Sequence, residues 1–257
     1  MAFTLKTEDD IVKLREGGKR LAHILTEVAQ RVAPGVTTLS LNELTEKLIR
    51  EGGDEPSLLG YTPRGAKRPY PATMCISVNE EVVHGIPTEN SRVLQDGDIV
   101  GLDCVMTHQG LMVDATVTVI AGKASKESKR LLQATKEGLE AGIKAARGGN
   151  HIGDIGAAVD AVAEKYGYGN VDELGGHGVG YKVHEEPYVP NFGQKGTGVL
   201  LVPGMVLAIE PMFTEGSPEV KLLRDGYTFV TKDGSRAAHF EHTIVITDGA
   251  AEVLTKA

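Results

Sequence analysis

The sequence predicts an α+β protein, and three observations indicate this class. Segments with amphipathic helical spacing alternate with shorter runs of alternating apolar residues. The order of two helices followed by strands occurs twice, over residues 6–120 and 125–247, which predicts two similar halves around one shared sheet. No linker rich in serine or charge separates these halves. A single compact domain is therefore expected over residues 1–257.

The first half opens with a predicted helix from about Lys6 to Val32, in which apolar residues recur at helical spacing. Ala33-Pro34-Gly35 ends this helix, because proline and glycine both break helical structure. A second helix is predicted over Leu41–Arg50, and a loop rich in glycine and proline over Pro56–Pro71. Alternating apolar runs then predict strands at Thr73–Val78, Ile99–Thr107 and Met112–Ile120.

The second half repeats this order. A long helix is predicted from Ser125 and is interrupted at Ala146-Arg147-Gly148, as the first helix is interrupted by its own proline and glycine. A further helix is predicted over Ile152–Tyr166, closing at Gly167. Strands are expected at Met205–Glu210, Tyr227–Thr231 and Thr243–Thr247.

The composition is that of an ordinary globular protein, with 41% hydrophobic and 24% charged residues. A net charge of −8 disfavours a nucleic-acid surface, since such surfaces depend on clustered lysine and arginine. Two cysteines are too few for a disulfide framework or a structural zinc finger, so reduced thiols are expected. The N-terminal residues contain no apolar signal segment, and no run approaches the roughly 18 apolar residues of a membrane span. A cytoplasmic enzyme without membrane association is expected.

Two aspartates mark the most informative segment. If residues 101–105 and 112–118 form one antiparallel hairpin, with its midpoint between His108 and Gln109, Asp103 and Asp114 oppose each other on the same face. At about 5 Å and an effective dielectric constant of roughly 20, their repulsion is about 3 kcal/mol. A divalent cation between the two carboxylates would convert this repulsion into a binding site.

Three further residues extend the candidate site. His177 lies between two glycines, Glu210 ends an apolar strand before a proline, and Glu241 begins a strand of isoleucine and valine. Each has an ordinary structural explanation when taken alone, such as a solvated turn or a strand end. Together they place carboxylates and an imidazole beside several apolar strands, where an unpaired acid is costly. Such a donor set suits Mn, Fe(II), Co or Zn, and two metals would balance four carboxylates better than one.

The same segments carry a resemblance that covers essentially the whole chain. In order, they read CISVNEEVVHGIP, DGDIVGLDCVMTHQGLMVDATVTVI, GGHGVGYKVHEEP, VPGMVLAIEPMF and HFEHTIVIT. They resemble the type I methionine aminopeptidases, which have the pita-bread metallopeptidase fold, and the order and spacing of the motifs are very specific. The resemblance implies two pseudo-symmetric halves with a central curved antiparallel sheet covered by helices.

The resemblance also implies a ligand set. Asp103, Asp114, His177, Glu210 and Glu241 match the five metal ligands of the family. By this similarity, Asp114 and Glu241 would bridge two divalent cations, Asp103 would hold one of them, and His177 with Glu210 would hold the other. The metals would be Co, Mn, Fe(II) or Zn, and a hydroxide bridging them would attack the first peptide carbonyl.

Two more histidines receive roles from the resemblance. His84 matches the family histidine that contacts the scissile amide nitrogen, and His184 matches the one near the carbonyl oxygen. Glu210 also matches the residue that accepts a proton from the attacking water. The three are the expected catalytic residues.

The side chain of the substrate methionine would require an apolar pocket, which suits an unbranched thioether packed against aromatic rings. The family's pocket positions correspond to Tyr61, Tyr70, Cys75 and Tyr227. Tyr227 stands where many bacterial relatives have tryptophan, and an insertion is expected around Thr62–Arg68. These departures predict a wider pocket than is usual for the family.

The resemblance implies removal of the N-terminal (initiator) methionine from nascent proteins and peptides with a small second residue. The expected partners are nascent chains near the ribosome, and a monomer is expected. One alternative is a proline-directed aminopeptidase or prolidase-like relative, although such proteins usually carry a further N-terminal domain. Another is a non-catalytic binding protein on the same fold, although such proteins typically lose metal ligands, and all five are present here.

Overall fold

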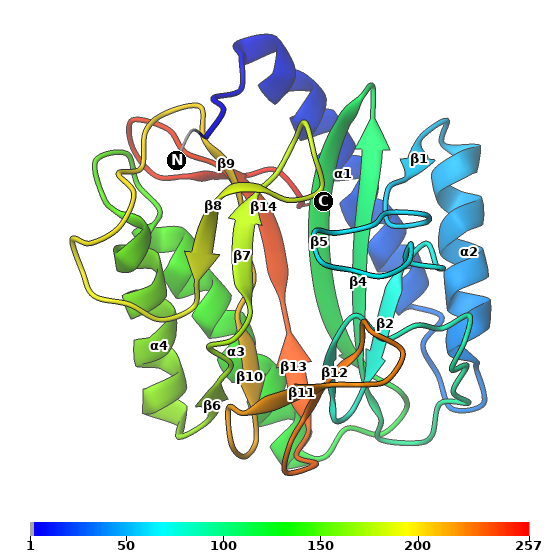
Figure 1. Ribbon diagram of the computed structural model, residues 1–257. Helices are drawn as coiled ribbons and strands as arrows, with labels where there is room; N and C mark the ends of the chain where they lie inside the picture. The colour runs from blue at the N-terminus through cyan, green and yellow to red at the C-terminus, as the bar shows by residue number, and fades with distance from the viewer. Residues whose placement is uncertain (1–2, 257) are drawn as a thin grey trace.

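The computed structural model describes residues 3–256, and the helices within them confirm the predicted helix pairs (Figure 1). Their bounds are α1 (Glu8–Ala29), α2 (Thr38–Glu51), α3 (Lys126–Ala145) and α4 (Ile152–Tyr166). α1 begins at a capping box. The Thr7 hydroxyl accepts a hydrogen bond from the Asp10 backbone amide, and the Asp10 carboxylate accepts one from the Thr7 backbone amide. Within the described residues, every helix lacks the length or the apolar composition that a bilayer crossing requires.

The strands confirm the predicted α+β class. Their bounds are β1 (Glu55–Pro56), β2 (Cys75–Val78), β3 (Glu81–Val83), β4 (Ile99–His108), β5 (Leu111–Ile120), β6 (Gly169–Asn170), β7 (Gly175–Gly178), β8 (Glu185–Pro190), β9 (Val206–Ile209), β10 (Met212–Thr214), β11 (Val220–Leu222), β12 (Phe229–Thr231), β13 (Ala237–His239), β14 (Glu241–Val245) and β15 (Glu252–Val253). The main sheet is antiparallel and runs β1-β4-β5-β14-β9-β7-β8, with β2 paired to β4 and β15 to β14. Two smaller sheets, β13-β10-β6 and β11-β12-β3, lie at the lower end of the view in Figure 1.

Each helix pair covers one half of the main sheet. Leu14 of α1 packs in one apolar cluster with Leu102 of β4, and Leu139 of α3 packs in another with Ile244 of β14. Figure 1 shows α1 behind β4 and β5, and α3 and α4 on the side of β9 and β7. Because side chains alternate along a strand, Asp103 on β4 faces away from the helices that Leu102 contacts. The face opposite the helices is therefore the one that carries the acidic residues.

The register of the β4–β5 hairpin differs from the predicted one. His108 pairs with Leu111, so the turn consists of Gln109 and Gly110, with φ values of 48° and 80°. Two-residue turns with positive φ at both positions match the twist of hairpin strands, and glycine adopts this conformation without strain. The predicted opposition of the two aspartates is wrong, because Asp114 pairs with Val105 rather than Asp103. The shift is two residues, so both aspartates remain on one face as diagonal neighbours.

Candidate metal centre

A cavity of about 460 Å³ opens on the sheet face that the acidic residues occupy, and every residue predicted for the site lines it. These residues come from segments that lie far apart in the sequence. One part of the wall is built from carboxylates and imidazoles, and another is apolar. The predicted residues that line the cavity are Tyr61, Tyr70, Cys75, His84, Asp103, Asp114, His177, His184, Glu210, Tyr227 and Glu241.

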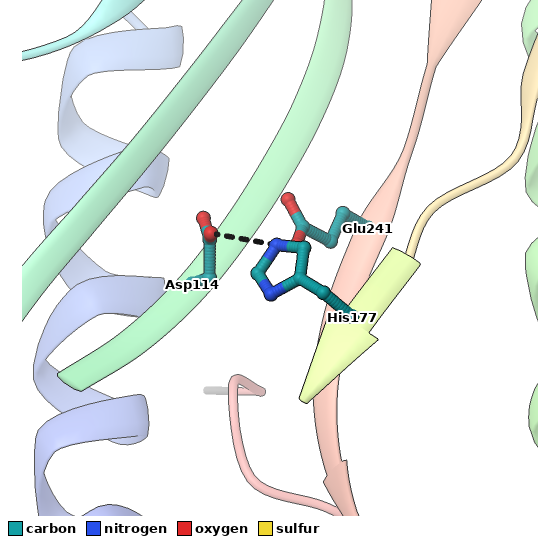
Figure 2. A group of neighbouring side chains, drawn as sticks. All are labelled: Asp114, His177 and Glu241. Atoms are coloured by element: carbon teal, nitrogen blue, oxygen red, sulfur yellow. Dashed lines mark ion pairs between the residues drawn. The ribbon is translucent and has the colours of Figure 1, made fainter. Parts of the chain in front are cut away.

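Three buried side chains converge in this cavity. Asp114 of β5, His177 of β7 and Glu241 of β14 each offer one ligand atom, and these atoms lie within 4.8 Å of one another. Figure 2 shows the three side chains pointing toward a common point from separate strands. His177 Nε2 lies 3.7 Å from Asp114 Oδ2. The three residues together could hold a metal ion.

Thr116 explains how neighbouring strands bring the acids to one place. It pairs with Asp103 across β4–β5 and with Glu241 across β5–β14. Its hydroxyl donates a 2.8 Å hydrogen bond to Glu241 Oε2. Asp103, Thr116 and Glu241 therefore form a row across three strands, and Asp114 lies two residues from the centre of that row. Strand register, rather than loop geometry, sets the positions of these carboxylates.

His177 is held in the form that binds metals. Its Nδ1 lies 2.9 Å from the Gly178 carbonyl, which can only accept, so Nδ1 carries the proton and Nε2 has a free lone pair. Burial, followed by the nearby His184, lowers the pKa of His177 to about 3. The imidazole is therefore neutral at neutral pH, and the Nε2 lone pair faces the carboxylates.

Two carboxylate oxygens of the cluster lack partners in the described part of the chain. Asp114 Oδ1 and Glu241 Oε1 are buried, and neither has a hydrogen-bond partner among residues 3–256. Burial and then the neighbouring carboxylates raise the pKa values of both groups well above the ordinary range. Buried charges without partners are costly, and a bound cation removes that cost. These oxygens and the lone pair of His177 fit a borderline divalent metal.

Glu210 and Asp103 lie beside the three central residues. Glu210 Oε1 is 3.5 Å from His177 Nε2, and burial followed by the charge of Asp103 raises the pKa of Glu210 well above its usual value. Asp103 pairs with Cys75 across β2–β4, and burial raises its pKa as well. Both residues line the cavity without belonging to the 4.8 Å group.

His239 is a neighbour of the site that the sequence did not identify. Its Nε2 lies 3.5 Å from Glu210 Oε2 and has no hydrogen-bond partner within the described part of the chain. Burial lowers its pKa to about 4, so it is neutral at neutral pH. It ends β13, a strand of three residues that pairs with β10 just after Glu210. Only its position two residues before Glu241 could have drawn attention to it.

The two predicted catalytic histidines lie in the cavity wall at different depths. His84 follows β3 with a positive φ of 60°, and burial lowers its pKa to about 4. His184 is exposed to solvent, and its Nδ1 lies 2.8 Å from the Tyr61 hydroxyl. Its ring meets the ring of His177 edge-on at 4.5 Å. Desolvation and then the nearby His84 lower the pKa of His184 to about 4, so both imidazoles are neutral at neutral pH.

The apolar wall is built around two tyrosines. The rings of Tyr70 and Tyr227 meet edge-on with centroids 5.1 Å apart, and they belong to one cluster with Cys75. The Tyr70 hydroxyl donates a 2.7 Å hydrogen bond to the Gly85 carbonyl, which leaves the ring itself for apolar contacts. The Tyr227 hydroxyl donates to the carbonyl of Arg68, in the segment where an insertion is expected. An apolar side chain can pack against these rings.

Comparisons with known proteins identify the family. Residues 12–248 match the metallopeptidase family M24. The chain belongs to metallopeptidase family M24. This M24 peptidase is 45% identical over 260 residues to the methionine aminopeptidase of Aquifex aeolicus (strain VF5), with all of both chains covered. It is also similar to the crystal structure of methionine aminopeptidase from Thermotoga maritima, with a TM-score of 0.94, 42% identity and all of both chains covered.

These comparisons confirm the resemblance to methionine aminopeptidases and the pita-bread fold. The prolidase from Pyrococcus horikoshii shares the fold with a TM-score of 0.76, at 21% identity. The match covers 98% of this M24 peptidase and 63% of that prolidase, so the two proteins share this fold. Membership of a metallopeptidase family and the donor set together indicate divalent metals as cofactors.

Proposed function

We propose that this M24 peptidase is a methionine aminopeptidase, a single catalytic domain that removes the initiator methionine from peptides and nascent proteins. One observation carries the proposal. Asp114, His177 and Glu241 form a cluster in which two buried oxygens have no partner among the described residues, and this cluster lies in the same cavity as an apolar wall with aromatic rings. Full-length similarity to methionine aminopeptidases supports the same activity. A small second residue is expected from the sequence resemblance described above.

We propose that Asp103, Asp114, His177, Glu210 and Glu241 hold two divalent cations, which would be Co, Mn, Fe(II) or Zn. Four ionised carboxylates carry four negative charges, and two divalent cations balance them. Bound divalent metal would supply Lewis acidity, which lowers the pKa of a water and polarises a carbonyl. The raised pKa values of the buried acids support a cationic partner, because neighbouring buried carboxylates do not ionise readily without one.

The remaining polar residues are assigned to the reaction itself. The Tyr61 hydroxyl can donate to His184 Nδ1, which leaves the proton on Nε2 and directs it toward the substrate carbonyl oxygen. His84 is neutral, and its ring N–H can support the departing amine by hydrogen bonding. Glu210 is assigned to accept a proton from the attacking water.

The apolar wall is assigned to the methionine side chain. Tyr61, Tyr70, Cys75 and Tyr227 offer ring faces, ring edges and a buried thiol, which suit a flexible thioether. Burial raises the pKa of the Cys75 thiol well above its usual value, so Cys75 remains uncharged and contributes apolar surface.

We further propose that the enzyme acts in the cytoplasm on nascent chains near the ribosome, where initiator methionine is first available. The two cysteines are buried free thiols, which suits a reducing compartment. A monomer is also proposed, as expected from the sequence.

A peptide panel tests the proposed function. Purified protein is loaded with Mn, Co, Fe(II) or Zn, and release of the first residue is measured for Met-Gly-X, Leu-Gly-X, Met-Leu-X and Xaa-Pro peptides. Methionine release from Met-Gly-X alone supports the proposal. Preferential cleavage before proline would identify the proline-directed alternative, and absence of hydrolysis with every metal would reject the activity.

His84→Ala is expected to lower kcat about 100-fold with little change in KM, because the side chain acts on the leaving group rather than on substrate binding. Steady-state kinetics with a Met-Gly-X peptide measures both constants. His23→Ala is the matched control, since His23 is an exposed histidine on α1. A change confined to KM would contradict the proposed role of His84.

His239→Ala is expected to weaken metal binding about 10–100-fold, which is the usual effect of losing a group that orients a ligand. The His239 Nε2 atom lies 3.5 Å from Glu210 Oε2 without a hydrogen bond between them, so we propose that the imidazole packs against the Glu210 carboxylate and limits its movement. Isothermal titration calorimetry with Mn measures the affinity. His242→Ala removes a neighbouring imidazole that bonds to Thr255 instead, and it should leave the affinity unchanged. Equal affinities in wild type and His239→Ala would show that His239 does not orient Glu210.

A further inference from the structure

The loop that carries His184 is folded around one buried carboxylate. This loop joins β7 to β8, and Glu185 is the first residue of β8. Glu185 Oε1 accepts hydrogen bonds from the backbone amides of Tyr181 and Lys182, at 2.6 and 2.9 Å. Glu185 Oε2 accepts a 2.6 Å bond from the Lys6 ammonium. The side chains of Lys6 and Glu185 are only 1% and 9% exposed, so the ion pair is shielded from water.

The space that Lys6 occupies is shaped for it. Gly180 has a φ of 137°, and a Cβ at this position would lie 2.5 Å from Lys6 Cε. The aliphatic part of Lys6 therefore passes directly over the backbone of the loop. Its ammonium also lies 4.9 Å from the centre of the Tyr181 ring, close enough for a cation–π contact. The Tyr181 hydroxyl donates to the Asp10 carboxylate on α1, which gives the loop a second attachment to the N-terminal segment.

The attachment adds to the contacts that hold the rest of the loop, in which the Gly180 carbonyl accepts a 2.7 Å hydrogen bond from the Met112 amide and Val183 is buried. The His184 side chain itself is exposed, and it contacts the Tyr61 hydroxyl and the edge of the His177 ring. The backbone of His184 is continuous with Glu185, so the Lys6–Glu185 pair helps to fix the backbone position from which the imidazole extends. A displacement of about 1 Å in a catalytic group can cost about 100-fold in rate.

We propose that Lys6 is a positioning residue for His184: its ammonium, through the Glu185 carboxylate, holds loop 179–184 so that the imidazole faces the metal cluster. The N-terminal segment thus belongs to the catalytic apparatus without contacting substrate. This inference rests on the proposed function, because His184 matters only if the cavity cleaves peptides.

The test compares Lys6→Met with wild type. Methionine preserves most of the side-chain volume and removes only the ammonium. We expect hydrogen exchange at the amides of Tyr181 and Lys182 to accelerate at least about tenfold, since their shared acceptor loses its anchor. We expect kcat on Met-Gly-X to fall about tenfold or more with KM nearly constant and Mn affinity unchanged. The imidazole ¹⁵N shifts of His184 should also change in the metal-free protein. Lys19→Met, at an exposed lysine on α1, is the control and should match wild type.

Glu185→Gln provides a second variant that does not depend on Lys6→Met folding well. If the two residues act as one unit, the double variant should lower kcat no further than either single variant. The proposal would be overturned if the fold-changes in kcat of the two single variants multiplied in the double variant. It would also be overturned if Lys6→Met had the amide exchange rates and the kcat of wild type. Failure of the proposed function is distinguishable, because wild type would then release no methionine while amide exchange and imidazole shifts still responded to Lys6→Met.

Discussion

Asp114→Asn is expected to abolish methionine release and to stabilise the metal-free protein at the same time. Asp114 is 5% exposed, one of its oxygens has no partner within residues 3–256, and its carboxylate is central to the proposed ligand set. Losing it removes several kcal/mol of transition-state stabilisation, which corresponds to a fall in kcat/KM on the order of a thousandfold. The side-chain amide of the variant is neutral, so the repulsion between the carboxylates of positions 114 and 241 disappears.

The stability gain should depend on pH in a defined direction. Burial and the charge of Glu241 raise the pKa of Asp114 above its ordinary value of 3.8, so the folded state retains a proton that the unfolded state has lost. The stability of the metal-free wild type therefore falls as pH rises above 3.8, and the advantage of Asp114→Asn should grow over the same range. Thermal unfolding with chelator present, measured across pH, tests this. Asp248→Asn is the exposed control. Wild-type activity in Asp114→Asn would rule out Asp114 as a ligand.

Chelation is expected to stop turnover completely and to lower the melting temperature at neutral pH. A metal that binds only the folded state stabilises it by about 3 kcal/mol when its free concentration is about 100 times its Kd. For a chain of this size, that loss lowers the melting temperature on the order of 5–10 °C. Activity should return when Mn, Co, Fe(II) or Zn is added in excess of the chelator.

The difference between metal-loaded and metal-free protein should widen with pH. Asp114, Glu210 and Glu241 have raised pKa values, so metal binding must displace protons from them and becomes easier as pH rises. His177 has a pKa of about 3, so its neutral form stabilises the fold above 6.5, and this contribution is lost as pH falls from 6.5 toward 3. Scanning calorimetry of both forms measures the difference, with Asp114→Asn as the control that should not respond to chelator. Identical melting temperatures with and without metal would contradict a metal bound at this cluster.

The longer elements were predictable from sequence because their local signals agree with the tertiary structure. The predicted helix over Ile152–Tyr166 has the same bounds as α4, since Gly167 adopts the left-handed conformation that ends it. The prediction located the β4–β5 hairpin but placed it in the wrong register. It centred the turn between His108 and Gln109, whereas the turn consists of Gln109 and Gly110. The pairing is displaced by two residues, and an even displacement leaves both aspartates on their predicted face of the sheet.

The short strands β7 and β13 were not predicted, because pairing with neighbouring strands, rather than local preference, creates them. β7 consists of Gly175–Gly178 with three glycines, a composition that does not favour strands, and it forms only between β8 and β9. β13 has three residues and pairs with β10. His239 lies on β13, so its approach to Glu210 became visible only in three dimensions. The residues predicted from sequence line the cavity, and the structure adds His239, which belongs to no recognised motif.

The position of β14 has a consequence for synthesis of the protein. This strand lies late in the chain, yet it pairs with β5 on one side and β9 on the other, in the middle of the sheet. During translation, the first half emerges before β14 is available. The edge of β5 that does not pair with β4 therefore stays unpaired until β14, which begins at Glu241, has left the ribosome. The strand that joins the halves also carries Glu241, so a polypeptide that stalls before it would lack both the joining strand and a proposed ligand. Completion of the sheet and assembly of the catalytic centre are thus one late event.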